Sequence, residues 1–364
     1  MLYSYDFKVN ETRFVTMVET TTERSLVLFP GALGDFVCFL PTFRFLSRGK
    51  PVDLLANPEF SDLVSRDVKV RSLESYEMSR LFVPGSAQEE RLRDFFGSYS
   101  SIFSWTGSSH CTFVQELDSV SQGRARVFPF QPSSERVHQA DYYLACVGGQ
   151  PLETSIPEIS LKPEAVAWSD HYWRQHGLYE RRVMAIAPGS GAREKNWPDR
   201  CFRLVADWWR QHTSGVVAII LGPVEEERGG YAALSHEPVT VRNLSLGQLS
   251  ALLARMDLYV GNDSGLTHLA AALGVRTVAL FGPSDIERWA PRGKKVALLT
   301  RKVECSPCEL SVMKTCSHRK CLTRLSPEFV IAELERLADG VTLTRGGSGF
   351  RLNAQFLQKL PERG

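Results

Sequence analysis

The sequence contains no long hydrophobic run. Its longest apolar stretches, such as GVVAII at 215–220, are far shorter than the roughly 20 residues that a membrane-spanning helix needs. The first residues, MLYSYDFKVNETRF, lack a basic segment followed by an apolar core, so we expect no secretory signal. No segment is low in complexity. These absences favour a water-soluble globular protein over a membrane-spanning or fibrous one.

The chain also lacks a strong net charge and a disulfide scaffold. Its 43 basic and 41 acidic residues leave a formal charge of +2, so nothing in the composition indicates a nucleic-acid partner. Eight cysteines in 364 residues are too few for a disulfide-stapled fold. With no export signal, we expect reduced thiols and a cytoplasmic location.

What is present is an alternation of short apolar strands and amphipathic helices. The length favours two domains, and the alternation predicts α/β domains, each with a mostly parallel sheet. Strands are expected at 25–29, 52–56, 101–105, 183–189, 215–223, 257–261 and 277–282, and helices at 35–47, 199–212, 245–256, 266–274 and 326–338. The predicted parts are an N-terminal extension (1–24, a hairpin or edge addition), a first Rossmann-like domain (25–165), an interdomain helix (166–182), a second Rossmann-like domain (183–338) and a C-terminal tail (339–364).

The first loop with chemical potential is PGALGD, which follows the strand at 25–29. Gly31 and Gly34 allow a tight turn or a close approach of a ligand. The loop matches neither a Walker loop nor the G-x-G-x-x-G pattern. Taken alone, Asp35 is better explained as a helix cap than as a catalytic carboxylate.

Two further loops open the second half. In APGSGAREKNWP, Ser190 and Gly191 supply hydrogen-bond donors and Lys195 a positive charge, although a solvated lysine is the simpler reading. In GPVEEERGG, three successive acids follow a strand; such a run is normally a charged helix start, although one of the acids could instead accept hydrogen bonds from a ribose.

The stretch VGNDSGLTHLAAALG carries the strongest local signal. Asp263, Ser264 and Gly265 open a helix, and His268 lies about one turn further on. Asp263 could be a cap and His268 a core residue. Together, however, they make a compact anion site at a helix N-terminus.

Taken together, these loops resemble glycosyltransferase family 9, the bacterial heptosyltransferases of lipopolysaccharide core synthesis. The resemblance rests on PGALGD, PGSGAREKNWP, VGNDSGLTHLAAALGVRTVALFGPSDIERWAP and the segment CSPCELSVMKTCSHRKCL, in that order, and runs from about residue 25 to 338. It implies a GT-B fold, with two Rossmann-like domains facing a central cleft. It further implies inverting, metal-independent transfer from an ADP-activated heptose.

The resemblance also implies roles by motif position. Asp35 matches the proposed general base, Lys195 the lysine near the donor phosphates, and Glu225 the acid near the donor ribose or base. Asp263, Ser264, Gly265 and His268 match the donor-binding helix start. Ser264 stands where threonine is common, which keeps the hydroxyl. In this context we expect Asp35 to be the base, because an inverting transferase must remove a proton from the attacking hydroxyl.

Four cysteines, Cys305, Cys308, Cys316 and Cys321, crowd into one loop. Their thiolates could hold a structural zinc or iron ion, with His318 as a weaker substitute, but only the first spacing is usual for zinc. The alternative is a loop braced by reduced cysteines. Catalysis itself is expected to need no cofactor.

The acceptor stays open. Residues 57–160, where acceptor contacts are expected, carry no recognisable motif. Arg44, Arg48 and His110 are candidates for an anionic acceptor, although each has a simpler surface or packing role. Lipopolysaccharide inner core is the expected acceptor, with at most peripheral contact with the inner membrane. The alternatives are another glycolipid acceptor, a protein acceptor, another sugar nucleotide as donor, an epimerase-like activity, and a non-catalytic nucleotide-binding role.

Overall fold

A computed structural model describes residues 23–132, 136–150, 155–229, 231, 234 and 239–338. The chain divides into two compact units, Met1–Ser160 and Leu161–Gly364. The expected N-terminal hairpin, except for its last two residues, and the C-terminal tail lie outside the described residues. The expected interdomain helix overlaps α6 (Pro163–Gln175), which belongs to the second unit. The finer domain bounds stay a prediction.

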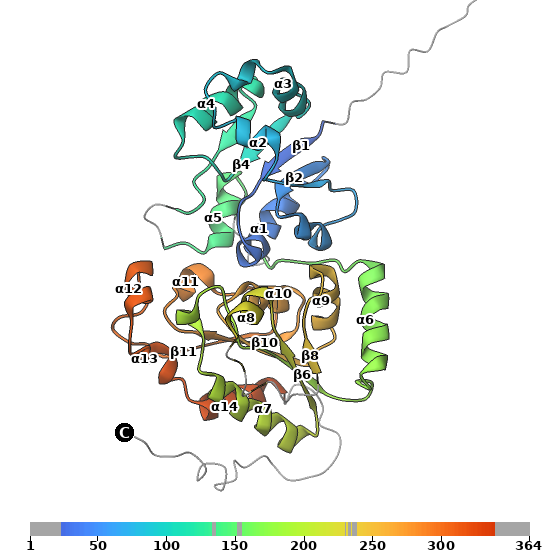
Figure 1. Ribbon diagram of the computed structural model, residues 1–364, viewed down its shortest axis with the longest axis vertical. Helices are drawn as coiled ribbons and strands as arrows, with labels where there is room; N and C mark the ends of the chain where they lie inside the picture. Colours follow the sequence, from blue (N-terminus) through green and yellow to red (C-terminus); the bar gives the residue numbers. More distant parts are fainter. Residues whose placement is uncertain are drawn as a thin grey trace, which may run out of the picture. The chain divides into compact units, whose positions relative to one another are not determined.

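The first unit contains a five-stranded parallel sheet in the order β3-β2-β1-β4-β5 (Figure 1). Its strands are β1 (Ser25–Leu28), β2 (Val52–Ala56), β3 (Val70–Ser72), β4 (Ser101–Ser104) and β5 (Ala125–Val127). Its helices are α1 (Leu33–Leu46), α2 (Tyr76–Arg80), α3 (Glu90–Gly97), α4 (Cys111–Val120) and α5 (Gln139–Cys146), with short 3-10 turns η1 (Pro58–Leu63) and η2 (Ser86–Gln88). The central strand β1 is buried throughout, as expected for a parallel strand covered on both faces.

Alternate residues of β1 face two different layers. Leu26 and Leu28 join a core with α3 and α4, whereas Phe29, directly after β1, stacks on Phe39 of α1 at 4.3 Å between ring centroids. Helix α1 in turn packs against α5. The sheet is therefore covered on both faces, and the loop between β1 and α1 emerges at the carboxyl end of its central strand.

The second unit repeats this plan with six parallel strands in the order β11-β10-β9-β6-β7-β8. The strands are β6 (Val183–Ala187), β7 (Val216–Ile220), β8 (Val239–Val241), β9 (Leu258–Asn262), β10 (Arg276–Phe281) and β11 (Val296–Thr300). Besides α6, the helices are α7 (Asp199–Thr213), α8 (Pro223–Arg228), α9 (Leu246–Leu253), α10 (Gly265–Ala272), α11 (Ile286–Trp289), α12 (Leu310–Thr315), α13 (Lys320–Thr323) and α14 (Pro327–Ala338), with the turn η3 (Arg193–Lys195).

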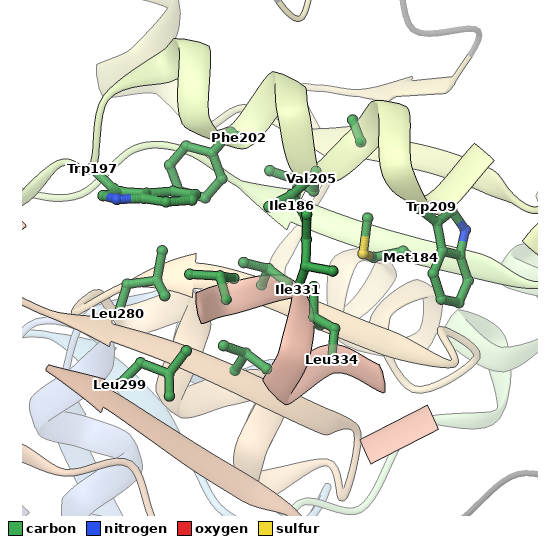
Figure 2. Packing of buried hydrophobic residues seen from close by; sticks show 14 of the residues in the cluster. Met184, Ile186, Trp197, Phe202, Val205, Trp209, Leu280, Leu299, Ile331 and Leu334 are labelled. Atoms are coloured by element: carbon green, nitrogen blue, oxygen red, sulfur yellow. The ribbon is translucent and has the colours of Figure 1, made fainter. Parts of the chain in front are cut away.

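The main core of the second unit lies between its sheet and the pair α7 and α14. Figure 2 shows Met184 and Ile186 of β6 pointing toward Val205 of α7 and Ile331 of α14. Trp197, from the loop that precedes α7, lies at one end of this core beside Phe202. Helices α9 and α10 pack together on the other face of the sheet (Figure 1). The loop that carries Lys195 is thereby anchored in the core only two residues after the lysine.

The predicted fold class is confirmed as two α/β units with doubly wound parallel sheets. The capping box at Ser245 and Gln248 is also present. The first helix begins at Leu33 rather than Asp35, so Gly34 lies inside it, and Asp35 is the third helical residue, where its carboxylate accepts from the N–H of the N-cap residue Ala32. The sequence pattern does not predict strands β3, β5, β8 and β11; three of the four are only three residues long. The cysteine segment, expected as a loop, contains α12 and α13.

Within the described part of the chain, none of the helices combines the length and the apolar character needed to cross a bilayer.

Candidate donor site and candidate base

The loops after β6 and β9 are neighbours, because the two strands pair in parallel up to Ala187 and Gly261. An ion pair joins them. Nζ of Lys195, in η3, donates to Oδ2 of Asp263 at 2.8 Å. Asp263 is buried, whereas the Lys195 side chain keeps 29% of its surface exposed. The structure therefore brings together two predicted site residues that are 68 positions apart in the sequence.

The turn that begins α10 is fixed by hydroxyl groups. Ser264 is the N-cap residue, and its Oγ lies 3.2 Å from Oγ1 of Thr267. Thr267 Oγ1 also lies 3.1 Å from the Tyr259 hydroxyl. Burial raises the pKa of the Tyr259 phenol. Gly265 is the first helical residue and His268 is buried one turn further on. The four predicted residues thus occupy one helix start, where backbone N–H groups and the helix dipole favour an anion.

The loop between β6 and η3 has its own polar network. Ser190 Oγ donates to Asn196 Oδ1 at 2.6 Å, and Asn196 Nδ2 donates to the Tyr231 hydroxyl at 3.2 Å. A Cβ at Gly191 would meet nothing within 4 Å. Ser190 therefore has a visible role in shaping the loop, whereas no steric constraint requires glycine at 191.

Glu225 both caps α8 and packs against the loop that follows β6. Its Oε2 accepts a hydrogen bond from the Gly222 N–H at 3.0 Å. A Cβ at Gly189 would lie only 1.9 Å from Glu225 Oε1, so a glycine at 189 makes room for the acid. Glu225 also lines a cavity of about 200 Å³ together with Tyr231 and Arg242. The helix-start reading of this acid therefore holds, and the carboxylate also borders a space open to a ligand.

Sequence reasoning passed over Asn262, which lies directly before Asp263. Its side chain is fully buried. Oδ1 accepts a hydrogen bond from the Trp197 N–H at 2.9 Å, and Nδ2 donates to the Pro188 carbonyl at 2.7 Å. A polar residue at the last position of an otherwise apolar strand was the available signal.

Asp35 lies in the first unit, in the first turn of α1, where its Oδ2 accepts a hydrogen bond from the Ala32 N–H at 3.1 Å. A Cβ at Gly31 would come within 2.6 Å of both the Asp35 Cβ and the Phe29 ring. The cap interpretation of Asp35 therefore describes a real contact, and the space at Gly31 leaves no room for a side chain between Asp35 and Phe29.

A buried phenol stands near Asp35. Tyr143 of α5 is fully buried, and its hydroxyl makes no hydrogen bond of normal geometry among the described residues. Burial raises the pKa of Tyr143, and the negative charge of Asp35 raises it further. This neutral hydroxyl is a polar neighbour of the candidate base that the sequence did not reveal.

The three candidates for an anionic acceptor make ordinary contacts. Arg44 forms an exposed ion pair with Glu158. Arg48 lies over the Phe45 ring at 5.7 Å from its centroid. His110 packs edge-on against Phe82, with 5.4 Å between ring centroids. None of these contacts singles out an acceptor site.

The cysteine segment gathers thiols without forming disulfides. None of the eight cysteines, all of which lie within the described residues, forms a disulfide. Burial and the neighbouring thiols raise the pKa of Cys308 and of Cys321. The Cys316 Sγ lies 3.7 Å from His318 Nδ1. Among the described residues, no three His, Cys, Asp or Glu side chains are placed together so that they could hold a metal ion. As placed, the four cysteines therefore do not form a metal centre.

Comparisons with known proteins show similarity to heptosyltransferases in both sequence and structure. The model of the family described as glycosyltransferase family 9 (heptosyltransferase) matches residues 118–321. Lipooligosaccharide heptosyltransferase 2 of Campylobacter jejuni (strain 81116) is 29% identical over 168 residues, which cover 43% of this chain and 52% of that protein. The chain thus spans about half the length of this curated relative.

Solved structures share the fold over nearly the whole described chain. The E. coli ADP-heptose lps heptosyltransferase II superposes with a TM-score of 0.65 at 20% identity, covering 87% of this chain and 99% of that one. The iron-containing dodecameric glycosyltransferase TibC from enterotoxigenic E. coli H10407 superposes with a TM-score of 0.57 at 15% identity, covering 88% and 77%. These similarities establish a GT-B fold.

Proposed function

The chain belongs to glycosyltransferase family 9, whose model matches more than half of its residues, and from this premise we propose that it is an inverting heptosyltransferase. It transfers a heptose from an ADP-activated donor to a hydroxyl of a lipopolysaccharide-core or related glycan acceptor. The observation that carries the proposal is the Lys195–Asp263 ion pair at the start of α10. It places a partly exposed cation beside a helix N-terminus, and this combination suits a nucleotide diphosphate.

The second unit holds the donor in this proposal. The diphosphate lies against the first turn of α10 at Ser264 and Gly265, with His268 behind them, and Lys195 turns from Asp263 toward its oxygens. Ser190 and Gly191 shape the adjoining loop, and Glu225 accepts hydrogen bonds from the ribose hydroxyls. As the bond from the anomeric carbon to the diphosphate oxygen breaks, negative charge grows on the departing ADP. The lysine and the helix dipole stabilise that charge, so this chemistry is assigned to the chain's own groups and needs no divalent metal.

The first unit supplies the base. The acceptor hydroxyl oxygen forms the new bond to the anomeric carbon on the face opposite the leaving group, which inverts the configuration. Its proton passes to the Asp35 carboxylate, a general-base step that contributes about 100-fold to 10,000-fold in rate. Gly31 and Gly34 let the backbone turn beside this carboxylate.

The setting of the reaction follows from its substrates. A glycolipid acceptor requires at most peripheral contact with the cytoplasmic face of the inner membrane, and we include a cytoplasmic location in the proposal. Eight cysteines within the described chain, none of which forms a disulfide, are consistent with a reducing compartment.

A structural metal at the cysteine segment is a separate part of the proposal. Four cysteines lie within 17 residues. Because no three of these described residues are placed together in the structure, a zinc or iron ion would have to draw their thiolates into one site as it binds. The iron content named for TibC supports this reading. The ion would brace the segment and takes no part in transfer. Metal analysis of purified protein tests it: about one equivalent, lost on replacing Cys305 and Cys308 by serine, is expected, and less than a tenth of an equivalent would overturn it.

A donor panel tests the main proposal. Calorimetry with ADP, UDP and GDP should give clear preference for ADP, and ADP-heptose with a lipopolysaccharide-core acceptor should yield ADP and an extended glycan. Preference for UDP would remove the heptose assignment and leave a transferase. Donor binding with isomerisation and no transfer would instead make the chain an epimerase-like enzyme.

A further inference from the structure

We infer that Asn262 is a positioning residue for Lys195, and that its buried side chain sets the lysine where the donor diphosphate binds. The inference rests on the proposed function and assigns a role that neither the resemblance nor the comparisons give to this residue. It concerns one side chain at the carboxyl end of β9, at the edge from which the donor loops emerge.

Asn262 joins the two ends of one loop. Its Nδ2 donates to the carbonyl of Pro188, directly after β6, and its Oδ1 accepts from the N–H of Trp197. The nine residues from Pro188 to Asn196 thus form a loop that starts and returns at the same side chain. The loop contains η3 and, in its last turn, Lys195.

Both bonds are made inside the protein, and this burial gives them their effect. Asn262 is fully buried, and the Trp197 indole that follows the loop is buried as well. Losing the amide would leave the Pro188 carbonyl and the Trp197 N–H without their partner in a buried place, which costs more than losing a hydrogen bond at the surface. The amide therefore specifies one loop path.

The consecutive residues Asn262 and Asp263 then act on the same loop at two points. Asp263 holds the Lys195 ammonium through the ion pair, whereas Asn262 holds the backbone two residues further on. When a diphosphate draws Lys195 away from Asp263, the position of the lysine depends on the remaining contacts of the loop, which include the backbone bonds to Asn262 and the Ser190–Asn196 bond. Preorganisation of this kind lowers the cost of binding.

The Trp197 side chain is held in the core by contacts that do not involve Asn262. The Trp197 indole Nε1 donates to the Leu325 carbonyl at 2.7 Å, and its ring packs beside Phe202 (Figure 2). Trp197 therefore stays in the core without Asn262, and the freedom gained on losing the amide falls on the loop before it, where Lys195 lies.

The experiment is a double-mutant cycle on ADP affinity. Asn262→Ala should weaken ADP binding about tenfold, which corresponds to about 1.4 kcal/mol. It should also raise the KM for the donor and leave the KM for the acceptor unchanged. In a Lys195→Ala background the same substitution should weaken binding by less than about twofold, because residues that act through one group are not additive.

Thr277→Val is the matched control. Thr277 is fully buried at the opposite end of the neighbouring strand β10, and its hydroxyl donates to the Val275 carbonyl at 3.0 Å. The control removes a buried hydrogen bond from the same sheet, so it should lower the Tm without changing ADP affinity. If Asn262→Ala does not fold, Asn262→Ser is the milder variant. Its hydroxyl can still bond one of the two backbone partners but is too short to meet both.

The outcomes separate this inference from the proposed function. Wild-type protein that neither binds ADP nor transfers sugar would end the proposed function. If the wild type binds ADP and Asn262→Ala binds it equally well, or loses the same factor with and without Lys195, the positioning role is wrong and the proposed function stands.

Discussion

The Asp35 carboxylate has an observed contact, with the Ala32 N–H, and a proposed role, as the base, and the two can be separated. The contact with the Ala32 N–H is a helix cap, and capping needs only a side-chain oxygen. Removing a proton from the acceptor needs a basic, ionised group. Asparagine offers the first and not the second.

We therefore predict that Asp35→Asn folds normally and transfers sugar at least about 100-fold more slowly. The free energy of unfolding should change by less than about 1 kcal/mol, because the asparagine Oδ1 can still accept from the Ala32 N–H and the lost interaction of the charge with the helix dipole is no larger than this. Initial rates and urea unfolding measure the two effects. A stable Asp35→Asn protein with near wild-type transfer would show that another group takes the proton.

Residues that hold other residues are the hardest to foresee. Asp263, Ser264 and His268 are predicted from their crowding at a helix start, whereas Asn262 is not, since its partners are the backbone of Pro188 and Trp197. Tyr143 is similar, because its proximity to Asp35 arises from the packing of α5 on α1. Such roles depend on contacts between residues far apart in the chain.

At the scale of elements, a buried charge ties strands of the first unit together. Asp53 of β2 pairs with Arg24, directly before β1, and accepts a hydrogen bond from the hydroxyl of Tyr99 at 3.2 Å. Burial, followed by the charge and the hydrogen bond of Asp53, raises the pKa of Tyr99 to about 12. These groups connect the amino ends of two strands to the segment after α3.

This network predicts how stability depends on alkaline pH. The phenol of Tyr99 has a higher pKa in the folded than in the unfolded chain, where it is about 10. Its contribution is therefore complete below about pH 10 and is lost as the pH rises through about 12. Urea unfolding should show Tyr99→Phe less stable by about 1 kcal/mol at about pH 9, with the difference shrinking toward about pH 12.

The exposed Tyr179 provides the control, since Tyr179→Phe should leave this pH dependence unchanged. A Tyr99→Phe deficit that stayed constant from about pH 9 to about pH 12 would contradict the assignment of the shift to Asp53 and burial.

At the scale of the whole molecule, the two units share one strand order, and the proposal assigns the base to the first unit and donor binding to the second. The candidate base follows β1, the central strand of the first sheet. The candidate anion site follows β9, which pairs with β6, the strand of the second sheet that corresponds to β1. Each site lies at the carboxyl ends of parallel strands, where open α/β sheets bind ligands.

Binding of ADP to the second unit should raise the stability of the protein. At about 100 times its Kd, ADP stabilises the folded state by about 2.7 kcal/mol, so the Tm should rise by several degrees. The rise should be the same in EDTA, and Lys195→Ala should abolish most of it. Thermal unfolding monitored by fluorescence measures the change. A rise seen only with added divalent metal would contradict metal-independent donor binding.

The sequence by itself determined the kind of fold and the residues that carry charge at its loops. Apolar runs such as SLVL and VMAIA predict buried parallel strands, and Gly, Ser and Asp after them predict loops for ligands. These signals are local, because strand burial and helix capping depend on a few neighbouring residues. Short edge strands such as β3 and β5, with exposed positions, carry too little of this pattern to be predicted.

Only the tertiary structure decided which of those residues meet. The pairing of β6 with β9 brings Lys195 to Asp263 and places Asn262 across the loop between them. The tertiary structure also buries Cys321 and leaves the other three cysteines of the 305–321 segment more exposed. Among the described residues, these thiols are not placed together around an ion. The physical reason is that hydrogen bonds, ion pairs and burial act through distances of a few ångströms in space. Separation along the sequence does not determine these distances in space, which are set only when the sheets form.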